Sequence, residues 1–262
     1  MNVLIVGDVV GRSGLDKLKE VLNKTIEENE IDFCIVNGEN SANGKGLRHE
    51  EYNEILSYGA DAITMGNHMY YRKEMATEYI KLPKLLIPAN ITNLTGNGHK
   101  LIEKNGIKYG VINIIGRAEM GEIIEKNVVN PFKKVTEEIE SLNQEGAEYI
   151  FVDFHAEATA EKIAMGYHLD GKVTCIFGTH THIQTADEMI FESGTAYITD
   201  VGMTGPKDSV IGLKKEVALK RFVEDSFAKY ECSKNPGIFN AVILNIDEST
   251  KKVTNIKRIF QR

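Results

Sequence analysis

Side chains that commonly bind metal ions follow a series of short apolar segments in this 262-residue chain. They occur in five groups, which are Gly7-Asp8, Asn37-Gly38-Glu39-Asn40, Gly66-Asn67-His68, Asp153-Phe154-His155 and Gly178-Thr179-His180-Thr181-His182. Each group comes directly after a run of mostly apolar residues, such as NVLIV or VTCIF, that is typical of a β-strand. Because an α/β sheet gathers its ligand-binding groups at the ends of its strands, we expect the five groups to meet at one edge.

The side chains in these groups suit a pair of divalent cations. Two ions about 3.5–4 Å apart need a bridging ligand and further ligands for each ion. Glu39 can bridge because the two oxygens of its carboxylate can bind different ions, and Asn40 beside it adds a neutral oxygen. Asp8 supplies a second carboxylate from another strand end. If the strand continues through His180 and His182, both imidazoles point to the same side of it.

Such a site favours the hydrolysis of a phosphate ester. Two cations neutralise the phosphate oxygens, lower the pKa of water and orient it for attack on phosphorus. The leaving oxygen then needs a proton, and His68, beside the candidate ligand Asn67, is a suitable donor. His155 is a further candidate ligand, and Asp153 could orient its imidazole.

Each group taken alone also has an ordinary structural explanation. Asp8 could be a turn residue or helix cap, residues 37–46 could be a flexible polar loop, and His155 could be a half-buried histidine. Residues 7–14 contain glycines at a spacing that resembles a phosphate-binding loop, but they lack Gly-Lys-Ser/Thr. The occurrence of all five groups in one chain favours metal binding. The other histidines are expected to be solvated or capping residues, namely His49, His99 and His168.

Composition limits the partners and the cellular location that can be expected for this chain. The net charge of −7 argues against a nucleic-acid backbone as the main partner, although bound cations could still hold a small phosphate ester. The three cysteines form no CxxC pair, which suits a reducing cytoplasm. The opening segment NVLIV is too short for a signal peptide, and no apolar run approaches the roughly 20 residues that span a membrane. We therefore expect a cytoplasmic protein with no membrane partner.

Strand-like and helix-like segments alternate along most of the chain, which predicts an α/β fold with parallel strands in the first half. Fewer crossovers and two hairpin signals predict a mixed arrangement in the second half. Ser13 is the expected N-cap of the first helix, and Asn105-Gly106 is an expected hairpin turn. The C-terminal segments FNAVILNI and VTNIKRIF are expected to form the second hairpin. Helices are predicted over residues 15–29, 50–58, 72–80, 132–144, 157–167 and 214–228.

The ordered groups resemble the metal-site motifs of the calcineurin-like metallophosphoesterase superfamily. More narrowly, GDVVGRSG, NGENSANGKG, GNH, VDFHAEATAEK, GTHTHIQTADE and AYITDVGMTGP resemble its YmdB-like bacterial phosphodiesterase branch over nearly the whole chain. The resemblance implies a four-layer αββα sandwich with two mixed β-sheets, formed by one domain over residues 1–262. It also implies hydrolysis of small cyclic nucleotides, 2′,3′-cyclic nucleotides among them.

The resemblance further implies a role for each candidate residue, with His68 as the proton donor. One ion would be held by Asp8, Glu39, Asn40 and His182, and the other by Glu39, Asn67, His155 and His180. The chain departs from the superfamily at Val10, where an Asp-x-His motif usually has its histidine, and at Met69, where many relatives have an acidic residue. The resulting shift towards oxygen ligands favours iron or manganese, with zinc or magnesium as alternatives.

Two alternatives to the cyclic-nucleotide phosphodiesterase remain open. The same metals could serve a phosphomonoesterase or general phosphatase, or the chain could be a regulatory protein that senses nucleotides or metals with little turnover. The sequence is compatible with a homo-oligomer, but it identifies no interface. Substrate contacts are expected from loops beside the five groups, namely from Arg12, Lys45, Tyr70, Tyr71, Arg117 and residues 202–206.

Overall fold

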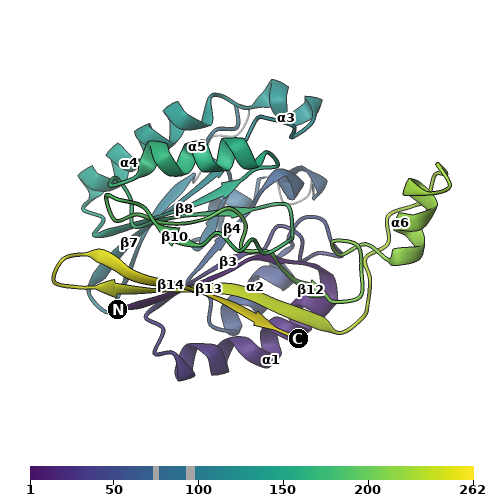
Figure 1. The fold of residues 1–262 in the computed structure, drawn as a ribbon, viewed down its shortest axis with the longest axis horizontal. Coiled ribbons are helices and arrows are strands. Elements are labelled where there is room, and N and C mark those ends of the chain that lie inside the picture. Colours follow the sequence, from purple (N-terminus) through teal and green to yellow (C-terminus); the bar gives the residue numbers. More distant parts are fainter. Residues whose placement is uncertain (73–76, 93–97) are drawn as a thin grey trace.

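Two β-sheets lie face to face in this computed structural model, and helices cover the outer surface of each sheet (Figure 1). The structure describes residues 1–72, 77–92 and 98–262. The four-layer αββα sandwich with two mixed sheets is therefore confirmed.

The first sheet contains the amino-terminal strands of the chain. In spatial order these are β2 (Asp8–Val9), β12 (Met203–Pro206), β13 (Gly237–Asp247), β1 (Asn2–Val6), β3 (Phe33–Asn37), β4 (Ala62–Thr64) and β5 (Leu85–Leu86), with β14 (Lys252–Gln261) beside β13. Strands β1, β3, β4 and β5 run parallel, as predicted for the first half. The C-terminal hairpin of β13 and β14 is also confirmed, and β13 pairs antiparallel with β1.

The second sheet is also mixed, as predicted. Its strands, in spatial order, are β10 (Met189–Ile190), β11 (Ala196–Ile198), β9 (Cys175–Thr179), β8 (Tyr149–His155), β7 (Ile107–Ile115) and β6 (His99–Lys104). The four central strands β7, β8, β9 and β11 pair in parallel. Only its outer strands, β6 and β10, pair antiparallel, and the predicted Asn105-Gly106 turn joins β6 to β7.

Helices complete the outer layers (Figure 1). The first sheet is covered by α1 (Gly11–Glu28) and α2 (His49–Ser57), and the second by α4 (Pro131–Glu145) and α5 (Thr159–Leu169). A short α3 (Glu122–Asn127) and two 3₁₀ helices, η1 (Asn67–Tyr71) and η3 (Tyr79–Lys81), lie in connections, and α6 (Lys215–Phe222) projects from the body. In the part of the chain that is described, no helix combines the length and apolarity needed to cross a membrane.

Apolar side chains fill the three spaces between the four layers. They alternate along each strand, so Ile5 points between the two sheets whereas Leu4 packs on the helix side. Between the sheets, the rings of Phe33 and Tyr109 stack with their centroids 4.2 Å apart. Because both faces of a central strand are buried, segments such as NVLIV are apolar at every position but one.

Several predicted helix ends are wrong. Helix α1 begins before Ser13, so that residue is not the N-cap; its hydroxyl instead donates to the carbonyl of Ser233 at 3.4 Å. Helix α6 ends at Phe222, well before residue 228, and α3 was not predicted because six residues are too few to show a helical period. The middle of the helix predicted over residues 72–80 lies outside the described residues.

His99 joins β6 to α4, and its contribution to stability should depend on pH. Its Nδ1 contacts the carboxylate of Glu138, and its Nε2 lies 3.1 Å from Oε1 of Glu145. The hydrogen bond with Glu138 outweighs the effect of burial and raises the pKa of His99 above its ordinary value of 6.5. A histidine whose pKa is higher in the folded state stabilises the fold below about pH 6.5, and this contribution disappears as the pH rises through the folded-state pKa.

We therefore expect His99→Gln to lower the free energy of unfolding by about 1 kcal/mol at pH 5.5, where the charged hydrogen bonds are present. The loss should be smaller at pH 9. Urea denaturation at both pH values measures it, with His49→Gln on the surface of α2 as the control. An equal loss at the two pH values would contradict the role given to the charged imidazole.

Candidate active site

Strand ends from both sheets meet at one edge of the sandwich, as the spacing of the polar groups predicts. Asp8 follows β1, Glu39 follows β3 and Asn67 follows β4, all in the first sheet. His155 ends β8 and His180 follows β9 in the second sheet. Hydrogen-bond distances link these five residues to Asn40, His68 and His182, so all eight predicted site residues lie together.

One cluster of potential ligand atoms surrounds the side-chain nitrogen of Asn40. This Nδ2 lies 3.3 Å from Oδ1 of Asp8 and 3.1 Å from Oε1 of Glu39. It is also 3.2 Å from Nε2 of His182. Three atoms with lone pairs therefore point to one position. A cation could occupy that region if the Asn40 amide turned over to present its oxygen.

A second cluster surrounds Nε2 of His155. This atom lies 2.9 Å from Oδ1 of Asn67 and 3.0 Å from Nδ1 of His180. Oε1 of Glu39 is 3.2 Å away, so the same carboxylate oxygen reaches both clusters. Ligand atoms of Glu39, His155 and His180 all lie within 4.8 Å of one another, a spacing that fits one metal ion.

His180 and His182 lie beyond β9, in backbone conformations that few residues other than glycine adopt. Strand β9 ends at Thr179, and the two histidines have φ values of 99° and 68°, so they do not lie on a continuing strand. The backbone N–H of His180 donates to Oδ2 of Asp8 at 3.2 Å. Nδ1 of His182 donates to the carbonyl of Ile211 at 2.9 Å, which leaves its Nε2 facing the first cluster. Conformations of this kind persist where surrounding contacts enforce them, often at functional sites.

A buried ion pair anchors the residue between these histidines. Nζ of Lys162 lies 2.8 Å from Oδ2 of Asp200, and both side chains are at most 1% exposed. The same oxygen accepts the backbone N–H and the hydroxyl of Thr181 at 3.0 and 2.7 Å. Sequence reasoning gave neither residue a role. Asp200 follows the strand-like segment TAYIT, as the other groups follow theirs, whereas nothing in the sequence marks Lys162.

Polar residues behind the His155 ring fix its orientation. Nδ1 of His155 donates to the hydroxyl of Thr179 at 2.8 Å, and that hydroxyl donates to Asp153 at 2.7 Å. The fully buried Asp153 also accepts hydrogen bonds from Asn37 and Thr64. Asp153 therefore orients His155 through Thr179 rather than directly. Asn37, Thr64 and Thr179 are the last residues of β3, β4 and β9, and sequence reasoning gave none of them a role.

The buried charges of the site fit a bound cation. Burial raises the pKa of Asp8 well above its ordinary value. Burial opposes the ionisation of Glu39, but His155 and His68 outweigh it and lower the pKa of Glu39 well below its ordinary value. Burial also opposes the charged form of His155, yet Glu39 raises its pKa to about 9. A proton on His155 thus balances buried carboxylates, and a metal ion bound to its neutral Nε2 could supply that positive charge instead.

His68 lies at the edge of the two clusters, on η1. Its backbone N–H donates to Oε2 of Glu39 at 3.1 Å, and its Nδ1 lies 2.5 Å from Oδ1 of Asn40. The ring of Tyr71 packs edge-on against the imidazole, with the centroids 5.1 Å apart. The side chain of His68 is 19% exposed whereas that of Glu39 is fully buried. His68 is therefore oriented by the site and still accessible to a substrate.

The predicted substrate contacts divide into two sets. Lys45 lies near the site, because its Nζ reaches the hydroxyl of Tyr71 at 3.2 Å. Arg12 instead forms ion pairs with Asp16 and Glu54, at 2.8 Å each, on the outer surface of α1. The structure therefore ties Arg12 to the packing of α1 against α2 and not to the site.

The other predicted substrate contacts are Arg117, residues 202–206 and Tyr70. Arg117 lines a separate cavity of about 490 Å³ together with Glu161 of α5. Residues 202–206 do not form the predicted loop, because Met203–Pro206 is strand β12, which pairs in parallel with β2 and brings Met203 opposite Asp8. The side chain of Tyr70 lies outside what the structure describes.

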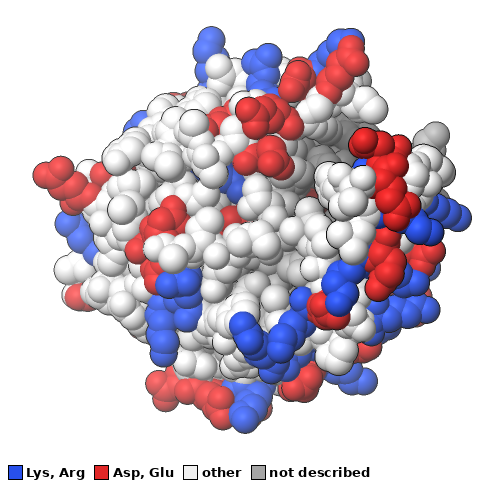
Figure 2. Space-filling model, turned by 45° about the vertical axis from the view of Figure 1, so that its right-hand side comes forward, with Lys and Arg blue, Asp and Glu red and all other residues white. Residues whose placement is uncertain are grey.

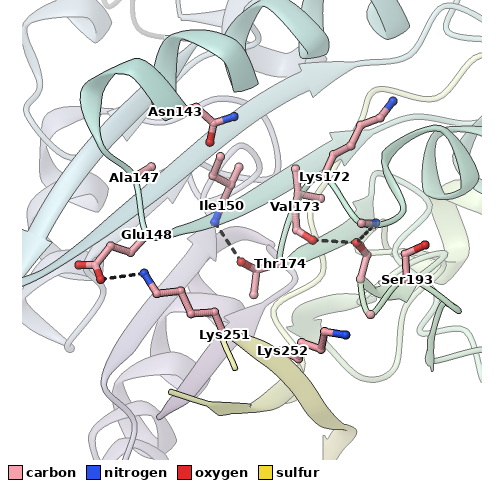
Figure 3. A pocket seen from close by; sticks show the side chains of 13 residues that line it. Asn143, Ala147, Glu148, Ile150, Lys172, Val173, Thr174, Ser193, Lys251 and Lys252 are labelled. Atoms are coloured by element: carbon pink, nitrogen blue, oxygen red, sulfur yellow. Dashed lines mark hydrogen bonds and ion pairs between the residues drawn. The ribbon is translucent and has the colours of Figure 1, made fainter. Parts of the chain in front are cut away.

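A cavity of about 240 Å³ lies at the edge of the second sheet opposite the ligand clusters (Figure 3). It lies where β8 and β9 begin, near Ile150 and Thr174, whereas the ligand clusters lie where these strands end. Lys251 in its wall reaches Glu148 at 3.1 Å. None of the residues lining it is a histidine or one of the predicted ligands.

Comparisons with known proteins identify the family of this chain. A protein-family model described as "YmdB-like protein" matches residues 4–259. The chain is 42% identical over 261 residues to the 2′,3′-cyclic-nucleotide 2′-phosphodiesterase of Bacillus subtilis (strain 168), covering 99% of this chain and 97% of that protein.

The chain is also similar to solved structures of phosphoric ester hydrolases. A crystal structure of a novel phosphatase from Mycoplasma pneumoniae matches with a TM-score of 0.91 and 36% identity, over 99% of this chain and 92% of that one. A 5′-nucleotidase precursor from Thermus thermophilus matches with a TM-score of 0.60 and 11% identity, over 100% of this chain and 54% of that one. The second likeness concerns the fold alone.

Proposed function

Because the chain belongs to the YmdB-like protein family, we propose that it hydrolyses small cyclic phosphodiesters, with nucleoside 2′,3′-cyclic phosphates as its substrates. The chain is a phosphoric ester hydrolase, as its relatives indicate. Its metallophosphoesterase-like family implies divalent metal ions, and the number of two ions is part of the proposal.

The carboxylate of Glu39 lies in both clusters of ligand atoms, and this observation carries the proposal. Its Oε1 is 3.1 Å from Nδ2 of Asn40 in the first cluster and 3.2 Å from Nε2 of His155 in the second. Two adjacent ions require such a shared ligand. One ion would be held by Asp8, Glu39, Asn40 and His182, and the other by Glu39, Asn67, His155 and His180.

When bound, divalent ions neutralise phosphate oxygens and make water a stronger nucleophile at neutral pH. Addition of water to phosphorus opens the cyclic ester by breaking one P–O bond to the ribose, and the released ribose oxygen must take up a proton. His68 would donate that proton, because its ring lies at the accessible edge of the site. The ring of Tyr71 and the hydrogen bond from the His68 backbone N–H to Glu39 would keep the imidazole in place during the transfer.

The ligand set also favours particular metals. Four of the seven proposed ligands offer oxygen, three offer imidazole nitrogen and none offers a thiolate; the oxygen ligands are Asp8, Glu39, Asn40 and Asn67. We propose iron or manganese, since mixed oxygen and imidazole sites suit these ions, with zinc and magnesium as the alternatives to be tested.

A small ester suits the surface better than a nucleic acid does. Basic side chains lie among acidic ones on the face drawn in Figure 2, and the net charge of the chain is −7. Extended contact with a phosphate backbone would need a concentration of positive charge. We also propose a cytoplasmic location, because Cys34, Cys175 and Cys232 are free thiols, as is usual in a reducing compartment.

Gly66 offers a test of the proposed ligand geometry. A Cβ at this position would lie 2.3 Å from Oε2 of Glu39 and 2.4 Å from Nε2 of His155. We expect Gly66→Ala to displace both side chains, to reduce bound metal and to lower kcat/KM by about 10²-fold, as a displacement of about 1 Å can do. Metal analysis and kinetics measure the effect. Gly106→Ala in the β6–β7 turn is the control for backbone strain away from the site, because its φ of 80° disfavours alanine although its Cβ would meet nothing within 4 Å; normal metal content in the Gly66 variant would contradict the geometry.

Metal content measured alongside the hydrolysis of 2′,3′-cyclic AMP tests the function itself. We expect about two ions per chain, loss of activity on chelation, and recovery when iron or manganese is added back. Rates on bis(p-nitrophenyl) phosphate and p-nitrophenyl phosphate separate a diesterase from a monoesterase. Faster monoester turnover would favour the general phosphatase, and bound metal without turnover of any ester would favour the sensing protein.

A further inference from the structure

A cavity of about 680 Å³ adjoins the second ligand cluster, at Asn67. Asn67 and Tyr71 of η1 line one part of it, and Met120, Ile123 and Ile124 at the start of α3 line another. Pockets for small organic ligands usually measure about 300–1,000 Å³, so a nucleoside would fit in this space.

Asn67 connects the cavity to the proposed chemistry. Its Oδ1 lies 2.9 Å from Nε2 of His155, in the second ligand cluster, and the same residue forms part of the cavity wall. An ester whose phosphate lies at the clusters would therefore have this space beside it. The nucleoside part of the bound substrate extends from the phosphate in one direction, and the cavity provides room for it beside the ligand clusters.

The walls of the cavity are mostly apolar, with Asn67 and Glu122 as the polar side chains among the residues that line it. Ile123 is 74% exposed and Tyr71 is 55% exposed, although both are large hydrophobic residues. The position of the Tyr71 ring is set without any ligand, because Nζ of Lys45 lies 4.4 Å above it and the His68 ring contacts its edge. A ring held in this way can stack on a flat partner without first losing much side-chain freedom.

We propose that this cavity is a nucleobase subsite, in which the base of the substrate packs against Tyr71 and Ile123. The inference rests on the proposed function, since it assumes that the phosphate binds at the ligand clusters. Stacking and apolar packing are available to every base, so the subsite would accept purine and pyrimidine nucleotides alike. It would make nucleoside cyclic phosphates better substrates than cyclic phosphates without a base.

Ile123→Asp tests the subsite. For comparison, glycerol 1,2-cyclic phosphate has the same five-membered phosphodiester ring as 2′,3′-cyclic AMP but no base. We expect the variant to lose about tenfold in kcat/KM for 2′,3′-cyclic AMP, mainly through KM, as the loss of one apolar side-chain contact with the base would cause. Its kcat/KM for glycerol 1,2-cyclic phosphate should not change. Ile123→Leu should behave like the unaltered protein.

Ile163→Asp is the matched control, because Ile163 is 42% exposed on α5 and does not line this cavity. An equal loss for both substrates in the Ile123 variant, or no loss for either, would overturn the subsite. Calorimetric binding of adenosine 3′-monophosphate and of inorganic phosphate to the metal-loaded protein separates this inference from the proposed function. Nucleotide binding that is tighter than phosphate binding and depends on Ile123 supports the subsite even if no cyclic ester is hydrolysed; equal binding of the two overturns it.

Discussion

Glu39→Ala is expected to lose both metal ions and, with them, the hydrolysis of 2′,3′-cyclic AMP. The carboxylate is fully buried, and its Oε1 approaches both clusters, at 3.1 Å from Asn40 and 3.2 Å from His155. Alanine removes the only proposed ligand that the two ions would share, and without it their mutual repulsion is no longer offset by a bridging charge. Metal analysis after dialysis measures the loss, and circular dichroism checks that the fold is retained.

Asp8→Ala is the control for the bridging role. Its Oδ1 lies 3.3 Å from Nδ2 of Asn40, and it belongs to the first cluster alone. We therefore expect this variant to retain about one ion per chain where the Glu39 variant retains none. Equal two-metal occupancy in the unaltered protein and the Glu39 variant would rule out a bridging Glu39. Loss of both ions in the Asp8 variant as well would mean that the two positions fill together.

His68→Ala is expected to lower kcat for 2′,3′-cyclic AMP by about 10²- to 10⁴-fold, the range that a general acid commonly contributes. Metal content should remain near that of the unaltered protein, because His68 is not among the proposed ligands. KM should change little if the imidazole acts on the leaving oxygen rather than on binding. Steady-state kinetics and metal analysis on the same preparation measure both properties.

Substrates with different leaving groups distinguish a proton-donating His68 from a structural one. A ribose oxygen is a strong base that needs a proton as it leaves, whereas p-nitrophenolate leaves readily without one. The His68 variant should therefore lose much less activity on bis(p-nitrophenyl) phosphate than on 2′,3′-cyclic AMP. A similar loss on both substrates would indicate that the substitution disturbs the site, for example through the 2.5 Å contact between Nδ1 of His68 and Asn40.

The strands could be predicted from the sequence because a strand that is buried on both faces consists of consecutive apolar residues. Segments such as Asn2–Val6 are almost wholly apolar since one set of side chains packs between the sheets and the other packs against helices. The mixed arrangement was readable as well, because both predicted hairpins are present, β6 with β7 and β13 with β14. Helix α3 was not predicted because six residues are too few to show a helical period. This helix lines part of the proposed nucleobase subsite.

The types of residue at the site were also readable, because each proposed ligand follows an apolar strand in a short polar group. The residues that orient these ligands could not be identified from the sequence. Asn37, Thr64 and Thr179 end their strands, and nothing in the sequence links them to Asp153; Thr179 reaches it from the neighbouring strand, and Asn37 and Thr64 reach it from the facing sheet. The pairing of Lys162 with Asp200 joins residues 38 positions apart and follows no local pattern.

The α/β class, the eight candidate residues and their meeting at one edge of a sheet could all be predicted from the sequence. These follow from local patterns, since the burial of a strand and the placement of polar groups at its end are encoded in consecutive residues. The folded chain was needed to show that His180 and His182 reach the site with positive φ angles, that Glu39 approaches both clusters, and that a cavity adjoins Asn67. These properties depend on contacts between distant segments, and such contacts arise from the packing of the two sheets.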